Sequence, residues 1–349
     1  MSEAAARAGQ AMTSEIAEQP EVFAELVAHR AAVLEVARAV AERSPRFVLL
    51  AARGSSDHAA LYAKYLVETL LELPCGLVSP STYTLYGARP ALEGVLLLAI
   101  SQSGGSPDLV EVTRTARESG ATTVALTNNV ESPLTSAAEI SVDIRAGHER
   151  AVAATKSYSA ALLALYLFVD AVRGGSGEHA RAVPELARKT LEGHHDAVSE
   201  AVRRYRFADR VVTTGRGYSS ASAAEAALKL AETSYLTARS FSGADLLHGP
   251  VAAVDAETAV FALCSEGRGS EAMVEVLDAV HGNGADVCAI GSAAARVPAS
   301  HRIEVPPCPE ELAPVLEVLP VQRLALGLAL ARGEDPDSPR GLHKVTRTR

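Results

Sequence analysis

The stretch LAARGSS, at residues 50–56, recurs 163 residues later as TTGRGYS, at residues 213–219. In both copies an apolar segment leads into a turn that contains glycine, and an Arg, a Gly and the final Ser coincide. At a shift of 164, SQSGGS at residues 101–106 aligns with SEGRGS at residues 265–270, and the VEV tripeptides that follow align as well. A register kept over this distance predicts that the chain holds two copies of one fold.

In each copy, short apolar segments alternate with helix-length segments of periodic hydrophobicity. The segments predicted as strands are 47–51, 95–100 and 123–126 in the first copy, and 210–214, 259–263 and 287–290 in the second. This alternation predicts an α/β protein with two tandem, doubly wound parallel sheets and helices on both faces of each. Ligands of such sheets bind at the carboxyl ends of the strands.

The turn-rich sequence RGGSG, at residues 173–177, marks the break between the two copies. The predicted divisions are a flexible amino-terminal tail (1–13), a first, phosphate-binding domain (14–173), a linker (174–182), a second, catalytic domain (183–332) and a carboxyl-terminal loop or lid (333–349).

The composition narrows the class of protein. The chain has 349 residues, of which 48% are hydrophobic, and this is enough for two buried cores. A net charge of −9 disfavours a nucleic-acid binder or a binder of anionic membranes, because both need a basic surface. A small anionic ligand is compatible with this charge, since a local pocket can oppose the overall sign.

The four cysteines lack the CxxC spacing of metal or redox sites. We therefore expect a reducing cytoplasm, with no metal and no other cofactor. The apolar run at residues 160–169 ends at Asp170 and is too short to span a bilayer, and the amino terminus lacks the pattern of a signal peptide. No membrane association is expected.

The loop SQSGGS lies between a predicted buried strand and a predicted helix. In one interpretation Ser106 or Asp108 caps the helix and the glycines form the turn. In the other, the hydroxyls and the free N–H groups of the helix terminus hold an anion. The second copy has Glu266 in this loop, which would repel an anion, so the first copy is predicted to hold it. The hydroxyls of the GSS turn at residues 54–56 favour the same interpretation.

Several segments together resemble a known family. They are GSS (54–56), SQSGGS (101–106), VAATK (152–156), EAALKLAETSYL (225–236), LLHGP (246–250), and the flanking SEIAEQPEVF (14–23) and DPDSPRGLHKVT (335–346). They resemble the tandem sugar isomerase (SIS) domains of glutamine:fructose-6-phosphate amidotransferases, in the same order along the chain. The resemblance extends over roughly residues 14–346.

The resemblance implies a ligand and a set of roles. The ligand would be a hexose 6-phosphate or an amino-sugar 6-phosphate. Glu232 would move a proton between C1 and C2, His248 would act in ring opening from the neighbouring subunit of a homodimer with shared active sites, and Lys344 would contact the open-chain carbonyl. The residues implied in binding phosphate and sugar are Ser55, Ser56, Ser101, Gln102, Ser103, Ser106 and Ala154.

The sequence departs from the family pattern at two positions. The family commonly has Lys at position 247 and Ser at position 154, where this chain has Leu247 and Ala154. The pattern of sugar hydroxyls that is recognised could therefore differ.

The residues themselves leave alternatives open. Glu232 lies in an apolar-rich helical tract, a setting that suits a general base, but Glu225 and Lys229 have the i, i+4 spacing of a surface ion pair. Glu232 could then be one more solvated charge. His248 could simply bond a carbonyl at the Gly-Pro turn that follows, and Lys344 lies in what also reads as a polar, fraying tail.

The family's glutaminase domain is expected to be missing, because the chain enters the isomerase-like region within about a dozen residues. This expectation favours a glucosamine-6-phosphate deaminase/isomerase. Two alternatives use the same residues: a lyase that removes the C2 proton and the 3-hydroxyl of N-acetylglucosamine 6-phosphate, and a fructosamine-6-phosphate deglycase. A further alternative is a non-catalytic sugar-phosphate sensor, but such regulators usually carry a basic helix-turn-helix.

Overall fold

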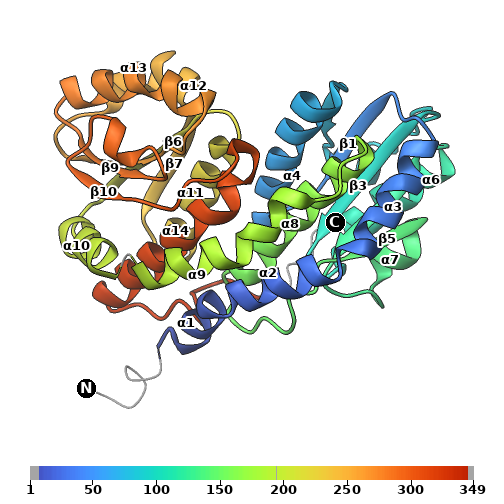
Figure 1. Ribbon diagram of the computed structural model, residues 1–349, viewed down its shortest axis with the longest axis horizontal. Coiled ribbons are helices and arrows are strands. Elements are labelled where there is room, and N and C mark those ends of the chain that lie inside the picture. The colour runs from blue at the N-terminus through green and yellow to red at the C-terminus, as the bar shows by residue number, and fades with distance from the viewer. Residues whose placement is uncertain (1–7, 194, 345–349) are drawn as a thin grey trace. The chain divides into compact units, whose positions relative to one another are not determined.

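The computed structural model describes residues 8–193 and 195–344. Among these, residues 21–149, 156–181 and 343–344 form one compact unit, which we call the first-repeat unit. Residues 8–20, 150–155 and 182–342 form the other, which we call the second-repeat unit. Figure 1 shows the strands of each unit as a sheet with helices around it.

The first-repeat unit is built on a sheet of five parallel strands in the order β2-β1-β3-β4-β5. The strands are β1 (Phe47–Ala51), β2 (Cys75–Leu77), β3 (Val95–Ser101), β4 (Thr122–Thr127) and β5 (Ile140–Asp143). The helices that lie wholly or mostly in this unit are α2 (Gln19–Ala28), α3 (Arg30–Glu42), α4 (Ser55–Leu66) with the π-helical turn η1 (Val67–Leu71), α5 (Pro80–Thr84), α6 (Pro107–Glu118), α7 (Pro133–Ala137), α8 (Lys156–Val172) and the short η2 (Glu178–Ala182).

The second-repeat unit contains a second parallel sheet, in the order β10-β9-β8-β6-β7. Its strands are β6 (Arg210–Gly215), β7 (Thr237–Ser242), β8 (Thr258–Leu263), β9 (Asp286–Ile290) and β10 (His301–Ile303). Its helices are α1 (Gln10–Ala17), α9 (Val183–Gly193), α10 (His195–Tyr205), α11 (Ser219–Ser234), α12 (Gly243–Leu247), α13 (Arg268–Gly282) and α14 (Ala313–Ala331), with the short turns η3 (Pro250–Ala253), η4 (Ala294–Arg296) and η5 (Glu310–Leu312).

The two sheets have the same topology. Matching β1 with β6, β2 with β7 and so on in chain order converts the strand order of the first sheet into that of the second. The predicted fold class, two tandem doubly wound parallel sheets, is therefore confirmed.

The six strands predicted from the sequence are all present, and they are the three central strands of each sheet. The four strands that the prediction missed, β2, β5, β7 and β10, are the edge strands. Edge strands are shorter or less apolar because one side has no partner strand: β10 has three residues, and β7 reads TARSFS with no fully buried residue.

Helices cover both faces of each sheet. Along β8, Ala259, Phe261 and Leu263 belong to a core with α10, α11 and α14, whereas Val260 and Ala262 belong to a core with α12 and α13. The alternation follows from the two-residue period of a strand. In the first-repeat unit, α5, α6 and α7 cover one face, and α4 packs on the sheet together with α3 and α8.

The amino-terminal segment is ordered where the structure describes it, which corrects the prediction of a flexible tail over residues 10–13. These residues form the first turn of α1, and Met12 is fully buried. The carboxylate of Asp337 accepts hydrogen bonds of 2.8 Å from the amides of both Ala11 and Met12, and Asp335 accepts one of 3.1 Å from Gly9. Residues of the predicted carboxyl-terminal loop thus bind the start of the chain; the predicted positions 1–7 and 345–349 lie outside the described residues.

One helical segment of the described chain, Glu310–Ala331, is long and apolar enough to cross a membrane by length and composition alone. Its most apolar window is 89% buried within the protein. This burial is what the core helix of a globular domain requires, because α14 packs on α9, α10 and α11.

Candidate active site

The SQSGGS loop lies at the carboxyl edge of the first sheet. It follows β3, and β3 pairs with β1, so the turn that precedes α4 ends at the same edge. Gly104 has a φ of 63°, and a Cβ atom at this position would lie 2.1 Å from the Oγ atom of Ser132. Only glycine fits this conformation and this space, so the loop is held close to the segment after β4.

The serine hydroxyls of this loop keep the ability to donate a hydrogen bond. The Oγ atoms of Ser101 and Ser103 accept hydrogen bonds from the amides of Gly104 and Gly105, at 3.2 and 3.3 Å. Because a hydroxyl group can accept and donate at the same time, each O–H stays able to donate to an anion. Ser101 is buried and Ser103 half-buried, so neither hydroxyl is simply solvated.

The helix-cap interpretation of this loop is only partly met. Ser106 occupies the N-cap position of α6, but among the described residues its side chain accepts no capping hydrogen bond. Asp108 is buried in the first turn and binds the Nε atom of Arg53 at 2.8 Å. The Ser106 hydroxyl is thus left for another partner.

The second group of hydroxyls lies at the start of α4. Gly54 precedes the helix with a φ of 57°, and Ser55 and Ser56 are the first two helical residues, both half-buried. Free amides of a helix amino terminus favour an anion, and α4 has 12 residues. Two helix amino termini and their serines therefore meet the same edge of one sheet.

A buried ionic cluster lies on α11 in the second-repeat unit. Nζ of Lys229 is 2.6 Å from Oε2 of Glu232 and 3.4 Å from Oε1 of Glu225. The side chains of Lys229 and Glu225 are fully buried, and that of Glu232 is 23% exposed. The interpretation of this spacing as a surface ion pair was wrong, because the face of α11 that carries it packs inside the unit.

Charge balance explains how these groups can be buried. Burial by itself lowers the pKa of Lys229, but the carboxylates of Glu225 and Glu232 outweigh it, so the pKa of the ammonium group lies above its ordinary value. The cluster holds one cation between two anions. Glu232 alone of the three is partly accessible, which is what a residue that exchanges a proton with a ligand needs.

His248 follows α12 and is exposed. Its backbone amide donates to the carbonyl of Asp245 at 3.1 Å, but within the described residues its ring makes no hydrogen bond or ion pair. The interpretation of His248 as a histidine satisfied by a carbonyl is therefore not supported.

Lys344 binds a residue that the sequence did not single out. Its Nζ atom lies 2.7 Å from Oε2 of Glu149, which is fully buried and also accepts hydrogen bonds from the amide and hydroxyl of Ser157, at 3.0 and 2.6 Å. Burial by itself raises the pKa of Glu149, but the Lys344 ammonium and the Ser157 donors outweigh it and lower the pKa below its ordinary value. The sequence GHER around Glu149 resembles a solvated loop and carries no signal of this burial.

The remaining predicted residue, Ala154, is half-buried and groups with the second-repeat unit, as do Glu232 and His248. The serines of the GSS turn and of the SQSGGS loop, and Lys344, belong to the first-repeat unit. In the described parts of the chain, no three His, Cys, Asp or Glu side chains form a group that could hold a metal ion.

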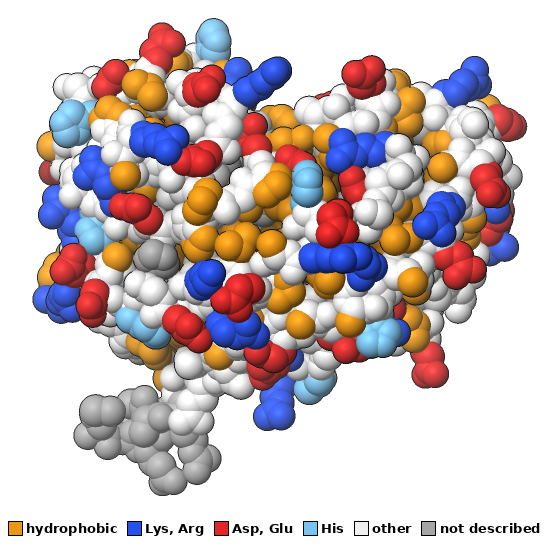
Figure 2. All heavy atoms as spheres, viewed as in Figure 1, with side chains coloured by type: hydrophobic (Ala, Val, Ile, Leu, Met, Phe, Trp, Pro, Cys, Tyr) orange, Lys and Arg blue, Asp and Glu red, His pale blue; other side chains and the backbone are white. Residues whose placement is uncertain are grey.

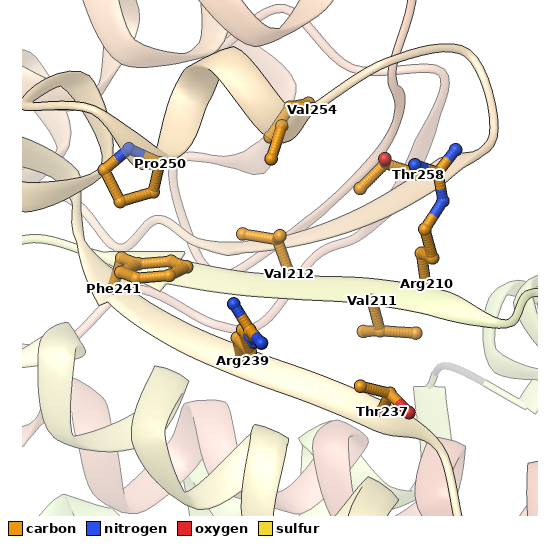
Figure 3. Close-up of a pocket in the computed structure, with 10 residues that line it drawn as sticks. Arg210, Val211, Val212, Thr237, Arg239, Phe241, Pro250, Val254 and Thr258 are labelled. Carbon is orange, nitrogen blue, oxygen red and sulfur yellow. The ribbon is translucent and has the colours of Figure 1, made fainter.

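A separate pocket of about 390 Å³ lies against β6 and β7 of the second-repeat unit. Figure 3 shows apolar side chains such as Val212, Phe241 and Val254 around it, with Arg239 among them. None of the predicted site residues lines this pocket. On the face shown in Figure 2, basic and acidic side chains are interspersed.

Comparison with known proteins identifies the relatives of this chain. It is 35% identical over 347 residues to the isomerizing glutamine–fructose-6-phosphate aminotransferase of Pyrobaculum aerophilum, covering 96% of this chain and 57% of that protein. The chain thus spans a little over half the length of this curated relative.

Two solved structures are also similar. A proposed phosphosugar isomerase from Silicibacter pomeroyi superposes with a TM-score of 0.86 at 35% identity, covering 94% of this chain and 99% of that one. The carboxyl-terminal domain of the glucosamine-fructose-6-phosphate aminotransferase from Francisella tularensis superposes with a TM-score of 0.87 at 25% identity, covering 95% and 98%.

The SIS domain model matches residues 43–171 and 205–332, which together make up most of the chain and coincide with its two sheets. The chain therefore belongs to the SIS domain family, with two SIS domains in tandem.

Proposed function

We propose that this protein is an amino-sugar 6-phosphate isomerase and deaminase that converts glucosamine 6-phosphate into a ketose phosphate and ammonia. The observation that carries the proposal is the cluster on α11, in which the buried Lys229 holds the partly exposed Glu232 at 2.6 Å. A fixed carboxylate with access to a ligand is what proton transfer between neighbouring carbons requires.

The reaction can be written with these groups. With the sugar in its open form, Glu232 would remove the proton from C2 and return it to C1, while a proton passes from the amino nitrogen to O1, so that the C1 carbonyl becomes an alcohol and a C=N bond forms at C2. The carbon that bears nitrogen is then an imine, and water adds to it and releases ammonia, leaving the ketose. One carboxylate serves both proton transfers because it is regenerated at the end.

The first-repeat unit would supply the binding groups. The hydroxyls of Ser55, Ser56, Ser101, Ser103 and Ser106, with Gln102, would hold the phosphate at the two helix amino termini. Lys344, held by Glu149, would place its ammonium group against the oxygen or nitrogen at the reacting end of the sugar. Its buried partner limits the positions that this flexible side chain can take.

The exposed His248 would act as acid or base in opening the ring. Because its ring has no hydrogen-bond partner among the described residues, it is available to a site on another subunit, and we propose a homodimer with shared active sites. A cytoplasmic location and the absence of nucleic-acid or membrane partners are part of the same proposal.

Two other reactions begin with the same proton removal. With an acetylated amine, the product of C2 deprotonation could lose the 3-hydroxyl, as in a lyase; with an amino acid on the nitrogen, the protein would be a deglycase. Ala154, where the family commonly has Ser, bears on this choice, because losing a hydroxyl beside the sugar changes which substituents are recognised. A non-catalytic sugar-phosphate sensor is disfavoured by the buried cluster around Lys229.

The products distinguish these hypotheses. Purified protein is incubated separately with glucosamine 6-phosphate, its N-acetyl derivative and fructosamine 6-phosphates, while ammonia, ketose and ultraviolet absorbance are followed together. Ammonia and ketose in equal amounts from glucosamine 6-phosphate support the proposal. New ultraviolet absorbance from the N-acetyl sugar indicates the lyase, and binding of all three without any product indicates the sensor.

A further inference from the structure

The second repeat has a loop that corresponds to SQSGGS. It follows β8, spans residues 265–270 and contains the amino terminus of α13, a helix of 15 residues. The turn after β6, with Arg216 and Gly217, corresponds to Arg53 and Gly54 of the first repeat. β6 and β8 are paired, so the turn and the loop end at the same edge of the second sheet.

A carboxylate of the chain itself lies between this turn and this loop. Glu310 accepts hydrogen bonds from the backbone amides of Arg268, at 3.0 Å, and Gly269, at 2.8 Å. A Cβ atom on Gly267 would lie 2.1 Å from Cδ of Glu310, and one on Gly217 would lie 4.0 Å from Oε1. Gly267, because it has no Cβ, thus leaves the room that the Glu310 carboxylate occupies.

The acid in this loop's anion position is therefore Glu310 and not Glu266. The sequence predicted that Glu266 would repel an anion, but its side chain instead pairs with Arg296 at 2.6 Å. The arginines of the turn and the loop, Arg216 and Arg268, make no ion pair within the part of the chain that the structure describes. No carboxylate of the described residues therefore neutralises these two arginines.

A second carboxylate binds the serines of this repeat. Oγ of Ser219, the counterpart of Ser56, donates a hydrogen bond of 2.7 Å to the fully buried Glu317 of α14. In the first repeat, the segment before the matching helix α8 reads AVAAT at residues 151–155 and contains no acid. The buried acid nearest this segment, Glu149, binds Ser157 and Lys344 instead, and the loop amides that correspond to those of Arg268 and Gly269 donate to Ser101 and Ser103.

We propose that the second SIS domain retains a phosphate-type anion site and that the chain closes this site with Glu310 as an internal ligand. This proposal rests on the proposed function in one respect, because it compares the loop of the second repeat with the proposed phosphate site of the first. The contacts that support it directly are those of Glu310. It follows that the native chain binds one phosphate, in the first repeat, and that removal of the Glu310 carboxylate opens a second site.

The test measures inorganic phosphate binding to the full-length chain by equilibrium dialysis with labelled phosphate. Glu310→Ala is expected to bind a second equivalent per chain. In the Ser101→Ala/Ser103→Ala background, which weakens the first site, adding Glu310→Ala is expected to raise phosphate affinity by about tenfold or more, the scale of two hydrogen bonds to a charged group. Glu311→Ala removes the same charge from the same turn and serves as the control.

A second measurement tests the proposal even where a variant folds poorly. Phosphate is expected to raise the melting temperature of Glu310→Ala, and of the similarly sized Glu310→Gln, by more than it raises that of Glu311→Ala. If the Glu310 variants gain neither phosphate equivalents nor phosphate-dependent stability over Glu311→Ala, Glu310 is only a helix cap and the proposal is wrong. Loss of phosphate binding in Ser101→Ala/Ser103→Ala reports on the first repeat separately, so the two proposals can fail independently.

Discussion

Lys344 and Glu149 form an ion pair of 2.7 Å within the first-repeat unit, although 195 residues separate them in the sequence. Glu149 is fully buried, and Lys344 is 26% exposed. The carboxylate has no water to replace a lost partner, whereas the ammonium group has some. This asymmetry makes Glu149 the more sensitive of the two positions.

Glu149→Gln is expected to lower the free energy of unfolding by about 1–3 kcal/mol and turnover by about tenfold or more, because Lys344 loses the group that orients it. Lys344→Met is expected to lower turnover as well, and the double variant should be little worse than either single one. Glu139→Gln, which breaks the exposed pair with Arg43, is the control and should cost at most about 1 kcal/mol. Strictly additive effects on turnover would contradict a positioning role for Glu149.

The same carboxylate predicts a loss of stability in acid. Since the folded pKa of Glu149 is lowered, its contribution is present above the ordinary pKa of 4.5 and is lost as the pH falls through the folded pKa. The unfolding free energies of wild type and Glu149→Gln, measured by chemical denaturation, should therefore converge as the pH falls below 4.5. A difference that stayed constant down to the acid transition would mean that the pair does not titrate as described.

Ser101→Ala/Ser103→Ala should weaken binding of hexose 6-phosphates by about 1–3 kcal/mol, because two donors to a charged group are lost. Ser119→Ala, at the other end of α6, should leave affinity unchanged. Calorimetry with one hexose 6-phosphate gives both values. Equal affinities of the two variants for the sugar phosphate would support the interpretation of the loop as a helix cap.

Glu232→Gln should lower turnover by about 10²- to 10⁴-fold while sugar-phosphate binding survives, because the side chain keeps its shape but can no longer accept a proton. In D₂O, the wild type should exchange the proton on the carbon next to the carbonyl or imine, and the variant should not. Glu200→Gln, on the exposed side of α10, is the control. Normal turnover by Glu232→Gln would contradict every proposed reaction in which Glu232 first removes the proton from C2.

Mixed Glu232→Gln and His248→Ala chains should recover about one quarter of wild-type activity. At equal amounts, half of the dimers are mixed, and in each mixed dimer one shared site contains both wild-type residues. Subunit exchange is confirmed by native mass spectrometry before activity is measured. No recovery after exchange would mean that each site takes both residues from one chain.

The contribution of Glu317 to folding stability is expected to depend on pH in the opposite direction from that of Glu149. Burial raises the pKa of Glu317 and the nearby Glu310 raises it further, while the neighbouring serines, of which Ser219 donates a hydrogen bond of 2.7 Å, only partly oppose this. Its contribution to stability is therefore full below the ordinary pKa of 4.5 and is lost as the pH rises through the folded pKa.

Glu317→Gln removes this titration, so its stability relative to wild type should increase as the pH rises above 4.5. Glu311→Gln is the matched control. Parallel curves of unfolding free energy against pH for wild type and Glu317→Gln would contradict the burial of an ionisable group at this position.

The sequence predicted the parts of the fold that repeat or that are continuously apolar. The matching turns at Gly54 and Gly217 and the central strands were identified because their signal is local. The edge strands were missed because β7, for example, carries Arg239 and alternates with exposed positions. Their strand conformation depends on a partner strand, which a local pattern does not reveal.

The candidate site was predicted less completely for a related reason. The serines of the SQSGGS loop stand out in the sequence by their density, and their role in binding phosphate stays a prediction, but Glu149, Glu310 and Glu317 look like ordinary surface acids. Each is defined by a partner far away in the sequence: Lys344, the amides of the loop after β8, and Ser219. Long-range pairing of this kind is a property of the folded chain.

The contacts of Asp337 with Ala11 and Met12 have a consequence for the order of synthesis. The two segments are separated by 325 residues or more, so α1 is synthesised long before Asp337 and its first turn is completed by a much later part of the chain. Until Asp337 leaves the exit tunnel, the amides at the start of α1 lack this carboxylate. Helix α1 therefore reaches its final hydrogen bonding together with the segment that leads to Lys344.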